Sequence, residues 1–455
     1  MRPETCPGPW KRREVLRVGA LALGGIDLPR LLSARDRSGS ATAETSVILL
    51  FLHGGPSQLE TFDLKPDAPD GIRGVFQPIE TNVPGIAICE HFPKLAGLAD
   101  RIALVRSLHH EMAVHSDGQI EVMTGKTPPR IDPTSNSKSD HPDIGHITSH
   151  RRGSRADGLP RYVAMPSPLY ATQPTYLGTG VRPYTIADPT QPGFSPLGVA
   201  VSGPARNLDG RKDLLARLDA ARRSIDRRAG EAEALGRCQG QAFRLLTSPD
   251  VARAFDLERE GPRLRDRYGR HRWGQSCLLA RRLVEAGTSV VTLFMDTPKD
   301  GPDFTNWDDH PGNAGRPGHF GTYMKTRLPY LDEALSALIQ DVYDRGLDRR
   351  VMIVVMGEFG RTPRIRKGPP DQSVGRDHWP QASCALVSGG GLRMGQVIGA
   401  TDKHAAYPSR RPVSAKDLLA TVYHHLGIDT THVYHDHLGR PAPVLAEGSP
   451  IDELI

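Results

Sequence analysis

The chain has 455 residues, a formal net charge of +6 at pH 7 and only five cysteines. It has no run of Lys and Arg interleaved with aromatic residues, which argues against a nucleic-acid partner, and no CxxC pair of a zinc finger or thioredoxin-like protein. Beyond the N-terminal segment, no stretch supplies the roughly 18 consecutive apolar residues of a membrane-spanning helix.

The first 43 residues have the features of an export signal. Lys11-Arg12-Arg13 begins a segment that resembles a twin-arginine signal, a short apolar region follows at 18–26, and Ala41-Thr42-Ala43 offers a small-residue cleavage site. We expect export by the twin-arginine route to the periplasm or the extracellular space. The alternative is a basic, disordered N-terminus. Cleavage would leave 50 Lys and Arg against 48 Asp and Glu, so the basic charge says little about partners.

Residues 44–455 are expected to form a single α/β domain. The predicted strands are 47–52, 102–105, 290–295, 351–356 and 385–387. The run VMIVVM at 351–356 is apolar on both faces, which is typical of a strand in the middle of a parallel sheet covered by helices. Leucines at helical spacing over 328–342 predict a helix leading into this strand. Ser414 with Asp417, and then Gly427, predict the start and end of a later helix.

Two long stretches inside this domain are predicted to be insertions. Residues 127–205 are dense in Pro, Gly, Ser and Thr, which predicts loops. A loop region of this length is uncommon in a compact domain unless it helps to build a site. Residues 208–286 are rich in Arg, Glu and Ala, and we expect them to form helices that cover one side of the domain.

Polar side chains follow four of the predicted strands. These are His53 after 47–52; His109, His110, His115 and Asp117 after 102–105; Asp296, Asp308, Asp309 and His310 after 290–295; and Glu358 after 351–356. Ligands bind just past the carboxyl ends of parallel strands, so these positions predict a shared polar site. Asp377 and His378 return nearby in a loop flanked by Gly and Pro. The residue types suit a metal or an acid–base site, whereas the alternative is a Glu358 neutralised by Arg361 in a structural turn.

Seven segments resemble a known family. They are VILLFLHGGPSQLETFDLKPDAP, MTGKTP, NWDDH, GEFGRTP, GRDHWP, GQVIGATDKHAAYP and RPVSAKDLLATVYHHLGID, all within residues 47–446. They resemble the large bacterial family called domain of unknown function 1501, which is similar in fold to the alkaline phosphatase and sulfatase superfamily. The resemblance implies an α/β fold with a mixed, mostly parallel central sheet sandwiched by helices, and metal ligands at the strand ends.

The resemblance also implies a ligand set for a divalent metal ion, which would be zinc, calcium or manganese. His53 falls where the superfamily usually has its first metal-binding aspartate, and Asp308 and His310 resemble the aspartate and histidine of the phosphatase metal site. Phe359 stands where a metal-binding histidine is usual and cannot bind metal. The implied ligands are His53, Asp308, His310, Glu358, Asp377 and His378.

Two residues are candidates for catalysis and two for substrate binding. Sulfatase spacing places His115 where a sulfatase has its modifiable cysteine, so it could be a nucleophile, a general acid or a ligand. Ser57 is the other candidate nucleophile, although a Ser in a Gly-Pro turn more often bonds the local backbone. Lys126 and Arg361 could hold an anionic ester, and the alternative for both is surface charge.

Two functions remain open at this stage. The first is an exported metal-dependent hydrolase of phosphate or sulfate esters, including esters on a polysaccharide. The second is a catalytically degenerate protein of the same fold that binds anionic glycans or the cell envelope. Phe359 and the absence of Cys or Ser at position 115 favour the second function. The retained Asp308, His310, Glu358 and His378 favour the first.

Overall fold

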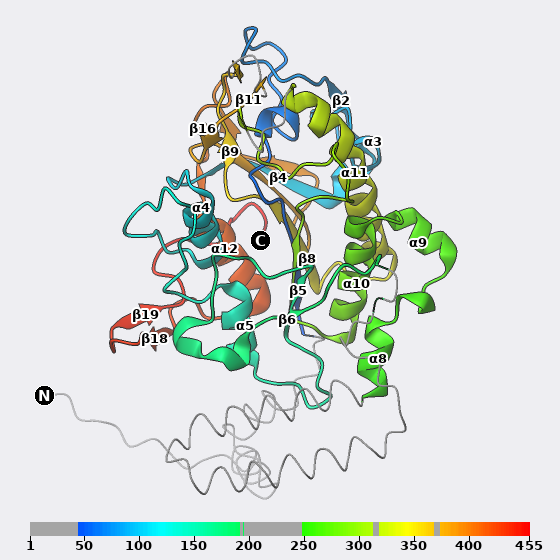
Figure 1. Ribbon diagram of the computed structural model, residues 1–455, viewed down its shortest axis with the longest axis vertical. Helices are drawn as coiled ribbons and strands as arrows, with labels where there is room; N and C mark the ends of the chain where they lie inside the picture. The colour runs from blue at the N-terminus through cyan, green and yellow to red at the C-terminus, as the bar shows by residue number, and fades with distance from the viewer. Residues whose placement is uncertain (1–43, 192–193, 195–247, 313–317, 368–373) are drawn as a thin grey trace, which may run out of the picture. The chain divides into compact units, whose positions relative to one another are not determined.

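A computed structural model describes residues 44–191, 194, 248–312, 318–367 and 374–455 of the chain (Figure 1). Contacts within the chain divide it into two units, residues 1–44 and 45–455, and the fold is that of the second unit. The predicted export signal at 1–43 lies outside the described residues, as does the predicted helical insertion up to residue 247.

Nine strands of the described residues form one sheet, in the order β14-β4-β13-β8-β1-β7-β5-β6, with β17 also paired to β4. They are β1 (Ser46–Phe51), β4 (Ile102–His109), β5 (Tyr162–Met165), β6 (Tyr184–Thr185), β7 (Val290–Phe294), β8 (Val351–Met356), β13 (Ser383–Gly389), β14 (Gln396–Ile398) and β17 (Val413–Ser414). β13 runs antiparallel to β4 and β8, and every other pair in this sheet is parallel. The predicted mixed, mostly parallel sheet is therefore confirmed, and β1, β4, β7 and β8 all end at one edge.

The centre of the sheet is buried on both faces because its strands are apolar throughout. All six residues of β1 and all six of β8 are buried. Phe51, the last residue of β1, pairs with Met356 of β8 on one side and with Phe294 of β7 on the other. The three strands therefore end at the same edge of the sheet, and the segments that follow them begin side by side there.

Helices cover the two faces of the sheet, as predicted. Ile48 and Leu50 of β1 belong to a core cluster with the leucines of α10 (Arg272–Ala286) and α11 (Phe320–Asp344). The intervening Val47 and Leu49 belong to a second cluster with α12 (Ala415–Leu426) and α5 (Ile144–Arg152). Figure 1 shows α10 and α11 on one side of the sheet and α12 with α4 (His115–Thr124) on the other. Side chains alternate across a strand, so one apolar strand serves both cores.

Shorter elements complete the described fold. The short helices are η1 (Gln58–Glu60), α3 (Pro93–Ala96), η2 (Ala99–Arg101), η3 (Thr175–Leu177), η4 (Thr179–Val181), α8 (Pro249–Phe255), η5 (Leu257–Arg259) and α9 (Pro262–Tyr268). The two-stranded pairings are β2 (Pro78–Glu80) with β3 (Ala87–Cys89), β9 (Gly360–Arg361) with β12 (His378–Trp379), β10 (Arg366–Lys367) with β11 (Val374–Gly375), β15 (Ala400–Thr401) with β16 (Pro408–Arg410), and β18 (Val433–His435) with β19 (Pro441–Pro443).

The stretch 127–205, predicted as loops, contains more regular structure than expected. It includes α5, β5 and β6 as well as loops. The sequence of α5, IGHITSHRR, is mostly polar and lacks the apolar spacing that reveals a helix. β5 has only four residues, too few to show a pattern. Within 208–286, the described part from residue 248 contains α8, η5, α9 and α10.

The start of α12 gives a test of a local stabilising contact. Asp417 N–H donates to Ser414 Oγ, Ser414 N–H donates to the Asp417 carboxylate, and Gly427 ends the helix in the left-handed conformation. Because Ser414→Ala removes one half of this capping box, we expect it to lower the free energy of unfolding by about 1 kcal/mol. Urea unfolding monitored by circular dichroism would measure the change. The exposed Ser154→Ala is the control, and an equal loss in both variants would contradict a specific cap.

Candidate functional site

The segments that leave β1, β4, β7 and β8 meet at the carboxyl edge of the sheet. His53 follows β1, His115 opens α4 after β4, Asp308 lies in the segment after β7, and Glu358 follows β8. Trp307 N–H donates to the carbonyl of His53 over 3.0 Å, which ties the first of these segments to the third. The topology alone therefore brings together residues that are far apart in the sequence.

A glycine makes this approach possible. Gly54 has a φ of +115°, and a Cβ at this position would lie 2.3 Å from the backbone nitrogen of Asp308. Any larger residue would push the turn after β1 away from the segment after β7. Gly54 N–H also donates to Glu358 Oε1 over 2.8 Å, so the same turn helps to fix the carboxylate.

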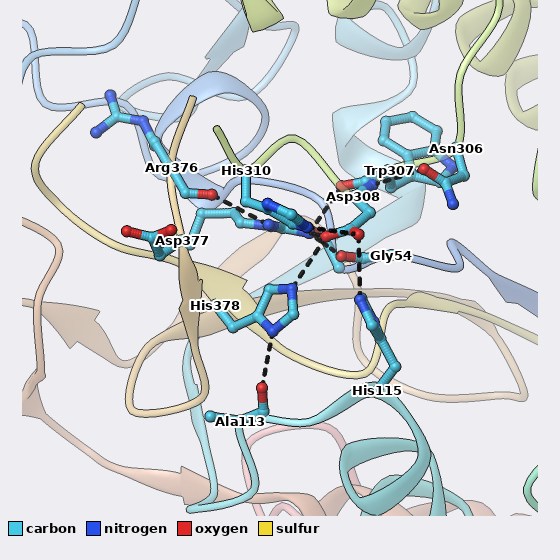
Figure 2. A network of polar contacts seen from close by, with 12 residues as sticks. Gly54, Ala113, His115, Asn306, Trp307, Asp308, His310, Arg376, Asp377 and His378 are labelled. Atoms are coloured by element: carbon cyan, nitrogen blue, oxygen red, sulfur yellow. Dashed lines mark hydrogen bonds and ion pairs between the residues drawn. The ribbon is translucent and has the colours of Figure 1, made fainter. Parts of the chain in front are cut away.

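Asp308 lies at the centre of the cluster, as Figure 2 shows. Its Oδ1 accepts a hydrogen bond from Arg361 Nη2 at 2.8 Å and is 3.0 Å from His378 Nε2. Its Oδ2 is 3.3 Å from His115 Nε2 and 3.1 Å from His310 Nε2. Burial opposes ionisation of this carboxyl, but Arg361 and the three imidazoles outweigh it and hold the pKa of Asp308 well below its usual range.

Two of the histidines are oriented by backbone carbonyls. His378 Nδ1 lies 2.8 Å from the carbonyl oxygen of Ala113, and His310 Nδ1 lies 2.9 Å from that of Pro311. A carbonyl oxygen can only accept, so each Nδ1 carries the proton and each Nε2 is directed at Asp308. Figure 2 shows the ring of His378 held between Ala113 and Asp308. This is the orientation of metal-binding histidines, whose second nitrogen is fixed by an outer hydrogen bond.

His115 bridges the two carboxylates of the cluster. Its Nδ1 is 2.6 Å from Glu358 Oε1, and its Nε2 faces Asp308. Burial opposes protonation of this ring, but the hydrogen bonds to Asp308 and Glu358 outweigh it and raise the pKa of His115 to about 9. Glu358 is fully buried, and His53 Nδ1 is 3.4 Å from its Oε1. Although burial again opposes the charge, the two histidines lower the pKa of Glu358.

The residues present fit a divalent metal ion. One ligand atom from each of His115, Asp308 and His378 can be chosen so that all three lie within 4.8 Å of one another. Ligand distances of roughly 2.0–2.6 Å allow a single ion to reach atoms with this spacing. Within the described residues, the buried Glu358 Oε2 has no hydrogen-bond partner, and a nearby cation would compensate this oxygen.

Aromatic rings pack around the histidines. Phe359 is fully buried, stacks on His378 with ring centroids 4.4 Å apart, and lies against His115 at 5.1 Å. His53 stacks on Phe294 at 4.7 Å. Position 359, where the resemblance implies a histidine, therefore has an apolar ring that packs against two other histidines.

The structure brings six of the predicted site residues into one cluster: His53, His115, Asp308, His310, Glu358 and His378. Asp377 is not part of it. Its carboxylate accepts from Arg366 Nη2 at 3.0 Å, and Figure 2 shows it pointing away from Asp308. Asp377 is adjacent to His378 in the sequence, but it precedes β12, and its backbone bonds to Thr362 rather than to a residue of the cluster.

Ser57 and Lys126 make their contacts outside this cluster. The Ser57 hydroxyl is buried and donates to the Glu60 carboxylate rather than to the local backbone. Lys126 follows the last turn of α4, about 15 Å along the helix axis from His115. Its ammonium donates to the carbonyl of Pro443 over 2.9 Å. These contacts favour structural roles for both residues.

Arg361 is fully buried, and all three nitrogens of its guanidinium donate hydrogen bonds within the protein. Its guanidinium donates to Asp308 and to the carbonyls of Gly54, Gly55, Trp307 and Arg376. Its placement favours a structural role over the predicted role in binding an anionic ester, although its carboxylate partner is Asp308 rather than Glu358 and the side chain is not at the surface. This burial is not readable from the sequence, because Arg361 lies in a two-residue strand with no pattern of its own.

Two further residues support the site, of which the sequence predicted only His110, as one of the polar residues after a strand. His110 is buried, and its Nε2 lies 2.5 Å from the carbonyl oxygen of Glu358. Burial lowers the pKa of His110 to about 4, so it is a neutral donor that fixes the backbone at Glu358. Tyr170 comes from the stretch 127–205 and packs edge-on against His53, with ring centroids 5.7 Å apart. His110 follows a predicted strand, but only its spatial partner reveals what it does.

Comparisons with known proteins give one family match and several distant structural similarities. The family described as "Protein of unknown function (DUF1501)" matches residues 44–455. No curated protein matches the chain. Similar solved structures include the lipoteichoic acid synthase LtaP from Listeria monocytogenes (10% identity, 86% of this chain and 74% of that chain covered, TM-score 0.37). Another is the PsFucS1 sulfatase from Pseudoalteromonas sp. (12% identity, 92% of this chain and 72% of that chain covered, TM-score 0.37). A third is the phosphonate monoester hydrolase of Agrobacterium radiobacter (12% identity, 85% of this chain and 74% of that chain covered, TM-score 0.37).

The burial of Arg361 leads to a prediction about stability. Arg361→Met keeps the apolar part of the side chain but leaves Asp308 and four buried carbonyls without their donor. We expect the free energy of unfolding to fall by about 3–5 kcal/mol, measured by urea unfolding. Arg366→Met is the control, because the Arg366 side chain is 64% exposed and its pair with Asp377 should contribute less than about 1 kcal/mol. If Arg361→Met were as stable as the wild type and bound anions more weakly, the anion-binding role would replace the structural one.

Proposed function

The chain belongs to the DUF1501 family, and we propose that it is a metal-dependent hydrolase of phosphate or sulfate esters. The observation that carries the proposal is the convergence of His115, Asp308 and His378 beside the buried Glu358. When bound there, a divalent ion would polarise an ester oxygen and lower the pKa of a water molecule.

We assign the roles of the residues from their contacts. Asp308 and His378 are ligands, since the ring of His378 is already fixed with Nε2 directed inward. His115 is a third ligand, because both of its nitrogens face carboxylates, which favours this role over a covalent nucleophile. Glu358 orients His115, and His310 lies at the more exposed side of the cluster, where it can exchange a proton with solvent. The attacking group is then a water molecule rather than Ser57 or His115.

The site suits one ion rather than two. Phe359 fills the position of a possible further ligand, and the Arg361 guanidinium already supplies positive charge 2.8 Å from Asp308. Two of the three converging groups are imidazoles, which suit zinc better than calcium or manganese. A divalent cation at this place would favour an anionic ester over a neutral one.

The metal content of the purified full-length protein tests the proposal. We expect about one divalent ion per chain by mass spectrometry, together with hydrolysis of nitrophenyl phosphate or nitrophenyl sulfate. His378→Ala should lose the ion and the hydrolysis together, because it removes a ligand. His424→Ala, an exposed histidine on α12, is the control and should keep both.

His115→Ala separates the roles of that residue. If it is a ligand, metal and activity should fall together. If it transfers protons or acts as the nucleophile, activity should drop by about 10²–10⁴-fold while the metal stays bound. A wild-type protein that carries no stoichiometric ion and cleaves neither ester would exclude the hydrolase. Phe359 would then favour the alternative function, a protein of this fold that binds anionic glycans or the cell envelope.

We also propose export by the twin-arginine route, supported by Arg12, Arg13 and the small residues at 41–43. Among the described residues, no helix is long and apolar enough to cross a membrane. Replacing both Arg12 and Arg13 with Lys should retain the protein in the cytoplasm, as measured by cell fractionation. The same change at Arg35 and Arg37 is the matched control. Normal export of the Arg12/Arg13 variant would rule out this route.

A further inference from the structure

Aromatic rings follow one another by contact along the candidate site. The order is Tyr170, His53, His115 and His378, and the centroids of neighbouring rings are 5.7, 5.6 and 4.4 Å apart. The proposed ligands His115 and His378 lie at one end of this series, together with Asp308. Tyr170 lies at the other end, beyond His53.

The two ends of this series face the two sides of a bound ester. In the proposed hydrolysis, the attacking water comes from the side of the ligands Asp308 and His378. When phosphorus or sulfur is transferred to water, the attacking and the leaving oxygen lie roughly in line with it. The leaving oxygen is therefore on the side of His53 and Tyr170. The two predicted ester-binding cations, Lys126 and Arg361, are engaged by protein carbonyls.

Backbone contacts hold Tyr170 in its place. The N–H of Ala171 donates to Gln119 Oε1 over 2.7 Å, and Gln119 is buried on α4, one turn after His115. The ammonium of Lys138 donates to the carbonyl of Tyr170 over 2.6 Å. The helix that begins with a proposed ligand therefore also fixes the segment of Tyr170, which is the kind of support that keeps a functional side chain in position.

The hydroxyl of Tyr170 has a partner that leaves its own proton free. It lies 3.3 Å from Ser135 Oγ, and Ser135 Oγ also accepts from the N–H of Ser116 over 3.2 Å. A serine oxygen that accepts this amide proton can donate its own proton to the phenol oxygen. The O–H of Tyr170 is then available to an acceptor in the site. Ser116 directly follows His115, so this contact also ties the hydroxyl to the start of α4.

The carboxylates of the site act on the same phenol. Burial raises the pKa of Tyr170, and the negative charges of Glu358, Asp117 and Asp308 raise it further, whereas the hydrogen bond with Ser135 opposes them. The phenol therefore lies within electrostatic range of both carboxylates of the cluster. The side chain is partly exposed, so one part of it is open to a ligand.

We propose that Tyr170 is a further catalytic residue, whose phenol donates a hydrogen bond to the leaving oxygen of the ester. The proposal rests on the proposed function. The oxygen of water bonds to phosphorus or sulfur, the bond from that atom to the leaving oxygen breaks, and the electron pair stays on the leaving oxygen. A donor aimed at this developing negative charge lowers the barrier. One proton of the water ends on the leaving oxygen, the other leaves with the phosphate or sulfate, and Tyr170 keeps its own proton.

Tyr170→Phe removes the hydroxyl and keeps the ring. With phenyl phosphate and phenyl sulfate, whose leaving oxygen develops much charge, we expect kcat/KM to fall by roughly tenfold or more. With the nitrophenyl esters, whose leaving oxygen spreads its charge into the ring, the fall should stay below about threefold. Tyr176→Phe is the matched control, because Tyr176 lies in the same stretch but packs against His141 and Tyr434.

Two further measurements do not depend on turnover. The metal content of Tyr170→Phe should equal that of the wild type. Inorganic phosphate, whose fourth oxygen would take the place of the leaving oxygen, should bind the variant roughly two- to tenfold more weakly by titration calorimetry. Loss of metal from the variant, unchanged phosphate binding or an equal fall in kcat/KM for phenyl and nitrophenyl esters would overturn the proposal.

The wild type separates this proposal from the proposed function. If it cleaves the esters and Tyr170→Phe cleaves the phenyl esters equally well, the role of Tyr170 is overturned and the hydrolase stands. If the wild type cleaves neither phenyl nor nitrophenyl esters, the hydrolase is excluded and the role of Tyr170 is excluded with it.

Discussion

The buried guanidinium of Arg361 is the interaction on which the site depends. It joins the turn after β1, the segment after β7 and the segment before β12, while Arg361 itself follows β8. Buried carbonyls that lose a donor destabilise the fold, so these bonds hold the segments together. An arginine side chain stays charged at all physiological pH values, so the charge opposite Asp308 does not titrate away. The backbone that carries the histidines therefore keeps its geometry whether or not an ion is bound.

The sequence indicates the place of the site better than its details. Two apolar runs, 47–52 and 351–356, identify strands buried on both faces, and strands of this type end at a common edge. The convergence of His53, Asp308 and Glu358 follows from that rule without any knowledge of side-chain contacts. Level strand ends, with Phe51 opposite both Met356 and Phe294, are the physical reason that these residues meet.

The remaining details depend on directions that sequence patterns do not encode. Asp377 and His378 are adjacent, yet only His378 contacts Asp308, whereas the Asp377 carboxylate accepts from Arg366. Arg361 has the residue type of an anion-binding side chain, but its burial is set by four carbonyls from distant segments. Tyr170 comes from a stretch with no apolar period, and its contact with His53 exists only once β5 lies beside β7.

The strand order also has a consequence for how the protein is made. β1 is the first strand of the sheet to be synthesised, but its two neighbours, β7 and β8, begin only at residues 290 and 351. The backbone edges of this apolar strand therefore remain unpaired while most of the polypeptide emerges from the ribosome. Such long-range pairings form slowly, and the waiting segments are prone to aggregate. His378 is synthesised later still, so the cluster of His115, Asp308 and His378 is complete only after most of the chain has been made.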